Sequence, residues 1–135
     1  MTTLQYTLVY FATVPIFFAI DLVWLGVIAK DFYRTHLGHL MGDVQWIPAI
    51  IFYLIYIVGI VLFAVSPAIQ ARSLLLALGL GALFGFIAYA TYDLTNLATL
   101  KDWPVLVTVV DLIWGSVLTS SVATLSYLVA VRFIV

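Results

Sequence analysis

The chain alternates long apolar stretches with short polar segments. Four stretches contain few charged residues and cover residues 4–29, 46–66, 73–97 and 104–132. A bilayer core about 30 Å thick needs about 20 apolar residues per helix, and each stretch meets this length. The pattern therefore predicts an all-α fold in which residues 1–135 form one domain, an integral membrane bundle of four transmembrane helices.

Four spans place both termini on one side of the membrane, here called the terminal side. The turn at residues 67–72 lies on this side too, because Pro67 is expected to end the second helix at Ser66. The connections at residues 30–45 and 98–103 lie on the opposite side, here called the loop side. Lysine and arginine are divided almost evenly between the two sides, so the positive-inside rule does not fix the orientation. Cytoplasmic termini are the default expectation.

The composition supports a multi-pass membrane protein and excludes several other classes. Hydrophobic residues make up 66% of the chain and charged residues 8%, too few to cover a water-facing surface. The net charge of −1 and the scattered basic residues offer no stripe for nucleic acid, so the lipid bilayer is the expected partner. Cysteine is absent, which excludes disulfides and thiolate metal sites, and the sequence specifies no cofactor.

Three aspartates interrupt the apolar stretches at one common depth. With a rise of about 1.5 Å per residue, Asp21 lies roughly 13 Å below Lys30, Asp93 roughly 12 Å below Lys101, and Asp111 roughly 10 Å below the start of the fourth helix. The first and third helices run toward the loop side and the fourth runs away from it, so three separate sequence positions converge on one layer. A carboxylate inside a membrane is costly and usually marks a functional site.

We expect these acids to line a polar pocket in the loop-side half of the bundle. No lysine or arginine lies at their depth within a span, so neighbouring aromatic and amide groups are the expected hydrogen-bond partners. In this hypothesis the tryptophans form aromatic walls and the asparagine orients a polar group. The predicted lining residues are Asp21, Trp24, Tyr89, Tyr92, Asp93, Asn96, Asp111 and Trp114. The alternative is a purely structural knot, in which protonated aspartates tie the helices together.

Small residues form a stripe on the third helix. Ala77, Gly81 and Gly85 recur every four positions and lead to Tyr89 and Asp93. Such a stripe lets two helix backbones approach closely in lipid, so we interpret it as a helix contact face that turns Asp93 into the bundle. The fourth helix carries a matching small and hydroxylated stripe, which makes the third and fourth helices the expected close pair. The Gly81/Gly85 face is also a candidate surface for a homo-oligomer or a larger membrane complex.

A weak internal repeat suggests two parallel helical hairpins. The segment that begins at Asp21 resembles the one that begins at Asp93, and each is followed by a Lys-Asp pair and a Trp- and Pro-containing helix start. Such a duplication would relate the halves by an axis along the membrane normal. Chance matching in a leucine-rich chain is the alternative explanation.

The loop-side connection contains two further candidates. His36 and His39 have a spacing that would allow both to bind one metal ion if the segment were helical, and the alternative is an interfacial pair without a metal. Residues 31–37 are interpreted in one of two ways. They form a short amphipathic segment that covers the layer of acids like a lid, or they form an ordinary solvent-exposed connection.

Four motifs together resemble a known family. They are Asp21-Leu-Val-Trp24, the block from Tyr92 to Thr99, Trp103-Pro104 and Asp111-Leu-Ile-Trp114-Gly115. In these motifs the chain is similar to an uncharacterised bacterial family of small four-helix membrane proteins, a domain of unknown function. The resemblance implies a bacterial inner-membrane protein and carries over no activity.

The sequence leaves three functional hypotheses. The first is a module that binds or moves a small ligand, proton or cation at the aspartates. The second is a lipid- or isoprenoid-modifying membrane enzyme in which one aspartate is a general base and another a general acid. The third is a structural subunit of a membrane complex.

Overall fold

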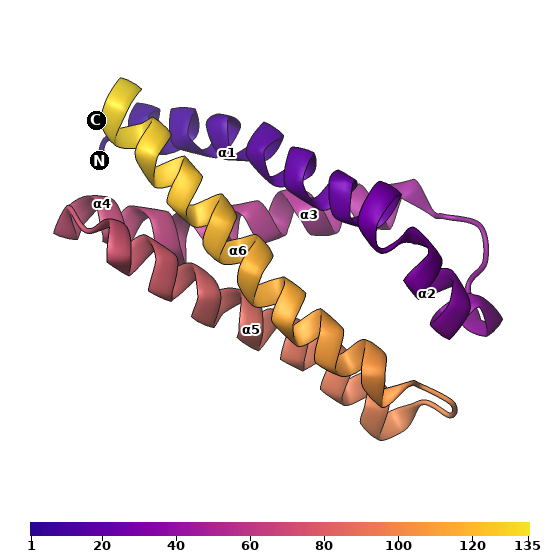
Figure 1. Cartoon of the computed structure of the whole chain (residues 1–135). Helices are drawn as coiled ribbons and strands as arrows, with labels where there is room; N and C mark the ends of the chain where they lie inside the picture. The colour runs from indigo at the N-terminus through magenta and orange to yellow at the C-terminus, as the bar shows by residue number, and fades with distance from the viewer.

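The computed structural model describes all 135 residues and is built from helices alone (Figure 1). Helix α1 covers Thr3–Val23 and continues as a π-helical segment at Trp24–Ile28, which is followed by α2 at Lys30–Leu37 and a 3-10 turn at Gly38–Leu40. Helix α3 covers Trp46–Ile60 and continues through a π-helical segment at Val61–Val65 into α4 at Ser66–Ala71. Helices α5, Leu74–Thr99, and α6, Val105–Phe133, complete the chain.

Four continuous helical stretches are long and apolar enough to cross a membrane, as the sequence predicted. They are Thr3–Ile28, Trp46–Ala71, Leu74–Thr99 and Val105–Phe133. Both termini lie at one end of the bundle together with α4, whereas α2 and the turn between α5 and α6 lie at the other end (Figure 1). The terminal side and the loop side are therefore the two ends of an elongated helical bundle.

The second span does not end at Ser66, contrary to the sequence-based expectation. The helical path runs on to Ala71 and ends at Arg72, whose φ of 50° is left-handed. Proline disturbs a helix because it has no N–H to donate and crowds the preceding turn. Here the wider π-helical turn at Val61–Val65 precedes Pro67, which occupies the first turn of α4, where a missing N–H is tolerated.

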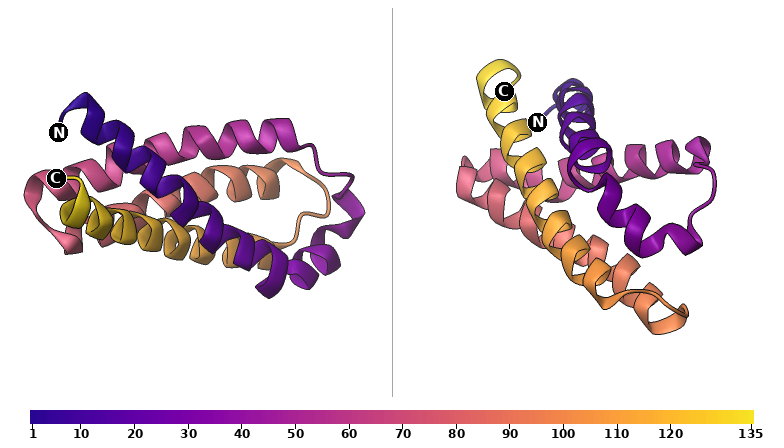
Figure 2. Two further views of the ribbon diagram at one scale, coloured as in Figure 1. Left: turned by 90° about the horizontal axis from the view of Figure 1, so that it is seen from above. Right: turned by 45° about the vertical axis from the view of Figure 1, so that its right-hand side comes forward.

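Helices α5 and α6 form the close pair that their small residues predicted. A Cβ atom at Gly85 would lie 2.0 Å from the Gly115 carbonyl oxygen, and one at Gly81 would lie 2.8 Å from the carbonyl oxygen of Thr119. The two helices run side by side along most of their length (Figure 2). The expectation that the Gly81/Gly85 face binds another copy or a larger complex is wrong, because α6 of the same chain occupies that face.

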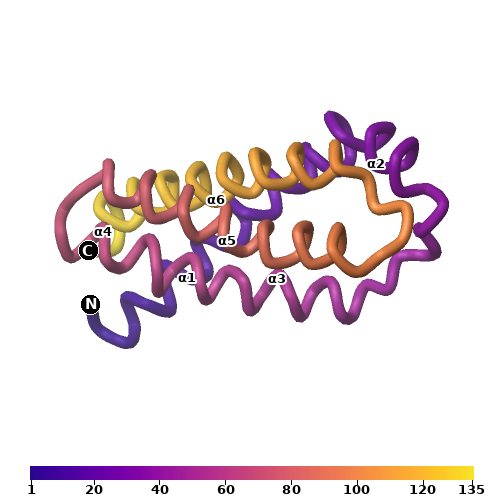
Figure 3. Tube along the Cα trace, turned by 90° about the horizontal axis from the view of Figure 1, so that it is seen from below, coloured from indigo at the N-terminus to yellow at the C-terminus, as the bar shows by residue number.

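The terminal-side half of the bundle has an apolar core. Phe17 of α1, Ile57 and Ile60 of α3, and Leu118 and Val122 of α6 are each 0% exposed. Helix α5 lies between α6 and α3 in the view from below (Figure 3), and it contributes Ala77 to the same core. No charged side chain belongs to this core, whereas the buried acids Asp21, Asp93 and Asp111 lie toward the loop side.

The two halves of the proposed repeat differ in detail. The connection between α1 and α3 contains α2, whereas α5 and α6 are joined by a short turn at residues 100–104. Contacts between α5 and α6 are far more extensive than those between α1 and α3. Internal duplication therefore stays a prediction.

Candidate functional site

Asp93 and Asp111 form a buried carboxyl pair across the interface of α5 and α6. Asp93 is 0% exposed and Asp111 is 5% exposed. Their carboxyl groups lie within hydrogen-bonding reach of each other, yet neither oxygen of Asp93 has a hydrogen-bond donor as partner. Two ionised carboxylates hold no hydrogen between them, so a bond within this pair requires a proton on one member.

The pairing follows from the way the two helices pack. Residues four positions apart lie on one face of a helix, so the face that carries Gly81 and Gly85 also carries Tyr89 and Asp93. Tyr89 packs directly against Gly115 of α6, where a Cβ atom would lie 2.3 Å from its ring. The close approach of the two backbones therefore continues up to the carboxyl pair and places Tyr89 just below it.

Tyr33 of α2 reaches the pair from the loop side. Its hydroxyl donates a hydrogen bond of 2.5 Å to Oδ1 of Asp111 and accepts one of 3.2 Å from Nε1 of Trp24. Burial and the bond to Asp111 together raise the pKa of Tyr33 above its ordinary value, so the phenol keeps its proton. Tyr33 was not among the predicted site residues, although it belongs to the segment predicted as an amphipathic lid.

Trp24 and Trp114 stack on each other and connect α1 to α6. Their ring centroids are 4.3 Å apart and the ring planes differ by 9°. We call these two residues the tryptophan bridge. Stacked rings at this separation are in contact and leave no space for a ligand between them, so their role as walls of a ligand pocket stays a prediction.

Asp21 joins the site through the tryptophan bridge. Its Oδ1 accepts a long hydrogen bond of 3.4 Å from Nε1 of Trp114, and Tyr53 of α3 lies close to its carboxyl group. The other ring of the bridge, Trp24, donates to Tyr33 and so leads to Asp111. Asp21 is therefore linked indirectly to the carboxyl pair, and Tyr53 is a second neighbour that the sequence did not reveal.

Tyr92 and Asn96 lie on the periphery of the site. Tyr92 is 56% exposed and packs edge-on against Trp103, with ring centroids 5.8 Å apart. Asn96 lies one turn further along α5 and is partly buried. These two residues therefore lie on an outer face of α5, while the other six predicted residues make the interior contacts described above.

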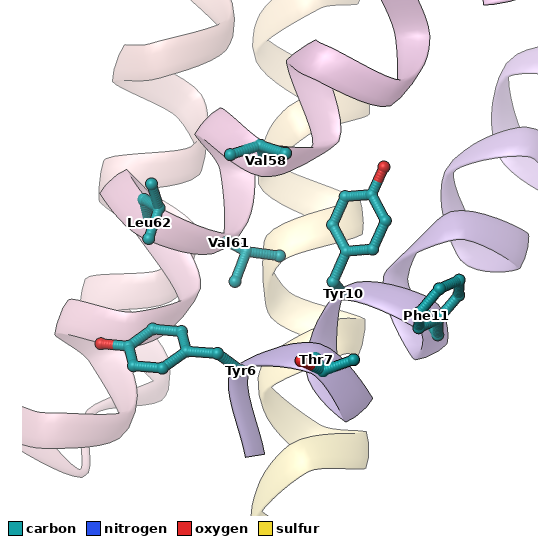
Figure 4. A pocket seen from close by; sticks show the side chains of 7 residues that line it. All are labelled: Tyr6, Thr7, Tyr10, Phe11, Val58, Val61 and Leu62. Atoms are coloured by element: carbon teal, nitrogen blue, oxygen red, sulfur yellow. The ribbon is translucent and has the colours of Figure 1, made fainter. Parts of the chain in front are cut away.

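Two hollows in the bundle have almost wholly apolar linings. One of about 400 Å³ is lined by Tyr6, Thr7, Tyr10, Phe11, Val58, Val61 and Leu62, between α1 and the second span (Figure 4). Tyr6 hydrogen-bonds Oγ of Ser66 at 2.9 Å, and Tyr10 donates to the Leu54 carbonyl at 3.0 Å. The other, of about 150 Å³, is lined by Trp24, Val110, Ile113, Trp114 and Val117. Neither hollow is lined by an acid.

The two histidines lie in different structural elements. His36 belongs to α2 and its Nδ1 lies 2.9 Å from the Phe32 carbonyl oxygen, whereas His39 belongs to the exposed 3-10 turn. No group of three histidine, cysteine, aspartate or glutamate side chains is arranged to hold a metal ion. Helix α2 therefore ends between His36 and His39, and the condition for a shared metal site, one helix that carries both residues, is not met.

A comparison against protein families finds a match over most of the chain. The family described as Predicted membrane protein (DUF2177) matches residues 6–128. The chain belongs to this family. No curated protein and no solved structure shows significant similarity to it. The family is one of unknown function, so its membership identifies a membrane protein and leaves the chemistry to the residues of the site.

Proposed function

We propose that this protein binds a proton reversibly at the Asp93–Asp111 pair, inside the membrane and on the loop-side half of the bundle. The observation that carries the proposal is Asp93, a carboxyl group that is 0% exposed and has no hydrogen-bond donor at either oxygen. An isolated ionised carboxylate in such surroundings is very costly, and the ordinary outcome is uptake of a proton.

The chemistry of the donor set favours a proton over a metal cation. The oxygens available at the pair come from Asp93, Asp111 and Tyr33, and Tyr33 directs a hydrogen toward Oδ1 of Asp111. Calcium takes about six to eight oxygen ligands, and magnesium demands octahedral oxygen coordination. A single proton between two carboxyl groups needs only the two oxygens that face each other.

The positions of the polar side chains support access of a proton to the carboxyl pair from the loop side. Tyr33 on α2 lies on that side of the pair. Toward the terminal side, Tyr56 and Thr119 hydrogen-bond each other at 2.7 Å, and beyond them lies the apolar core around Ile60 and Val122. This arrangement fits reversible binding from one side better than a continuous polar path across the membrane.

Infrared difference spectroscopy of the protein in lipid vesicles tests the proposal. The parent protein is expected to show a carboxylic acid band at neutral pH that disappears in the Asp93→Asn/Asp111→Asn double variant. Asp43→Asn is the matched control, because Asp43 is exposed and lies outside the spans. A double variant with the same carboxylic acid amplitude as the parent would refute the proposal.

A second hypothesis, a lipid- or isoprenoid-modifying enzyme, is favoured by one observation. The apolar hollow of about 150 Å³ lies against both rings of the tryptophan bridge, close to the acids. A hydrocarbon chain in that hollow would bring its polar end near Asp21. Lipid mass spectra of a deletion strain, complemented with the parent or with Asp21→Asn, test this. Identical spectra in all strains would exclude it.

A further inference from the structure

The two members of the carboxyl pair have different hydrogen-bond environments. Asp111 receives the Tyr33 hydroxyl at 2.5 Å, whereas Asp93 receives no donor at all. A hydrogen bond from a donor stabilises the ionised form of a carboxyl group, and a protonated carboxyl group can itself donate. The two aspartates therefore differ in their hydrogen-bond environment, although they are the same residue type and face each other across the α5–α6 interface.

The Trp24 hydrogen bond favours donation from the Tyr33 hydroxyl to Asp111. An indole N–H is a donor only, so the bond of 3.2 Å from Nε1 of Trp24 occupies a lone pair of the Tyr33 oxygen. The hydroxyl hydrogen is then free to point at Asp111. Because the pKa of Tyr33 is raised by burial and by this bond, the hydroxyl is a lasting donor and not a proton source.

Other charged groups near Tyr33 do not replace this bond. On α2 itself the ionisable side chains are Lys30, Asp31, Arg34 and His36, and none forms an ion pair with the carboxyl pair. From α5 and α6, the acids that face Tyr33 are Asp93 and Asp111. Tyr33 is thus the side chain of α2 that hydrogen-bonds the pair.

We propose that Tyr33 is a positioning residue: it keeps Asp111 ionised and thereby assigns the shared proton to Asp93, whose O–H donates to Asp111. This inference rests on the proposed function, because it names the member of the pair that holds the bound proton. It also gives α2 a role, since an interfacial helix on the loop side then controls the charge distribution inside the membrane.

The single variants are expected to behave differently in the infrared experiment. Asp93→Asn removes the protonated member, so the carboxylic acid band of the pair is lost. Asp111→Asn removes only the anionic acceptor, so the band stays with unchanged amplitude and moves to higher frequency. Loss of the band in Asp111→Asn with its retention in Asp93→Asn would overturn the inference while leaving the proposed function intact.

A double variant separates positioning from a merely structural role. In Asp93→Asn/Tyr33→Phe, Asp111 has lost its phenol donor and is expected to take up a proton, so a carboxylic acid band returns that Asp93→Asn lacks. Tyr92→Phe in the Asp93→Asn background is the matched control, because Tyr92 is exposed, packs against Trp103 and forms no hydrogen bond with Asp111. No return of the band, or equal return in both double variants, would contradict the role of Tyr33.

Failure of the two proposals can be told apart. If the parent has no band that depends on Asp93 or Asp111, the proposed function fails. If that band exists but Tyr33→Phe leaves it unchanged, both in the parent and in the Asp93→Asn variant, only the positioning role fails. Far-ultraviolet circular dichroism of each variant shows whether the spans remain helical. They are expected to remain helical, because Tyr33 belongs to α2, which lies outside the four spans.

Discussion

Replacing Gly85 by alanine is expected to disrupt the pairing of α5 and α6. The new Cβ atom would lie 2.0 Å from the Gly115 carbonyl oxygen and 2.7 Å from Oγ1 of Thr119. Ordinary contacts between heavy atoms are about 3.5–4.0 Å. The first obstacle is backbone and cannot rotate away, so the two helices must separate.

The size of the effect follows from the kind of obstacle. Overpacking a core with one extra methyl group costs typically about 1–3 kcal/mol. Because a backbone carbonyl blocks Gly85, we expect the upper end, about 3 kcal/mol, in the free energy of unfolding. Gly79 is the matched control on the same helix, since a Cβ there meets nothing within 4 Å. Gly79→Ala should change the stability by less than about 0.5 kcal/mol.

Unfolding in mixed micelles of increasing denaturing-detergent fraction, followed by circular dichroism and tyrosine fluorescence, measures both variants against the parent. The expected result is a large loss of stability for Gly85→Ala and a negligible change for Gly79→Ala. Equal stability of the two variants would refute the close packing of α5 and α6, and with it the geometry that brings Asp93 to Asp111.

Three further predictions concern the hydrogen bonds of the bundle. Tyr56→Phe should lower the unfolding free energy by about 1 kcal/mol in the same assay, because Thr119 loses its partner in the core; an unchanged stability would contradict that bond. A spin label at Thr35→Cys, in a chain without native cysteine, should become more mobile when Tyr33→Phe is added, and unchanged mobility would show that other contacts hold α2. The stabilisation from Tyr33 is present below its ordinary pKa of 10.0 and is lost as the pH rises through its higher folded value. The same label should therefore gain mobility only in strongly alkaline solution, and a gain near neutral pH would contradict a lasting phenol donor.

The nearness of Asp93 to Asp111 and the α5–α6 pair could be predicted from the sequence. Both depend on regular helical geometry, since a constant rise fixes the height of Asp93 and a four-residue spacing places it on the face of Gly85. The height of Asp93 and the face on which it lies depend on the geometry of a single helix. The prediction of a close contact in lipid then needed only the absence of bulky side chains along that face.

The partners of the acids could not be predicted in the same way. Tyr33 and Tyr53 reach Asp111 and Asp21 across large sequence separations, and the directions of these side chains depend on how α2 and α3 pack against the bundle. The stacking of Trp24 on Trp114 depends equally on the relative rotation of α1 and α6. The π-helical turn before Pro67 had no sequence signal either, which is why the second span was expected to be shorter.

Solid-state carbon NMR of the protein in lipid bilayers, with labelled aspartate, tests the central claim most directly. The account predicts a through-space cross-peak between the carboxyl carbons of Asp93 and Asp111, with the Asp93 carbon at the shift of a carboxylic acid and the Asp111 carbon at that of a carboxylate. Absence of the cross-peak in a well-ordered sample, or two carboxylate shifts at neutral pH, would contradict a proton held between these two side chains.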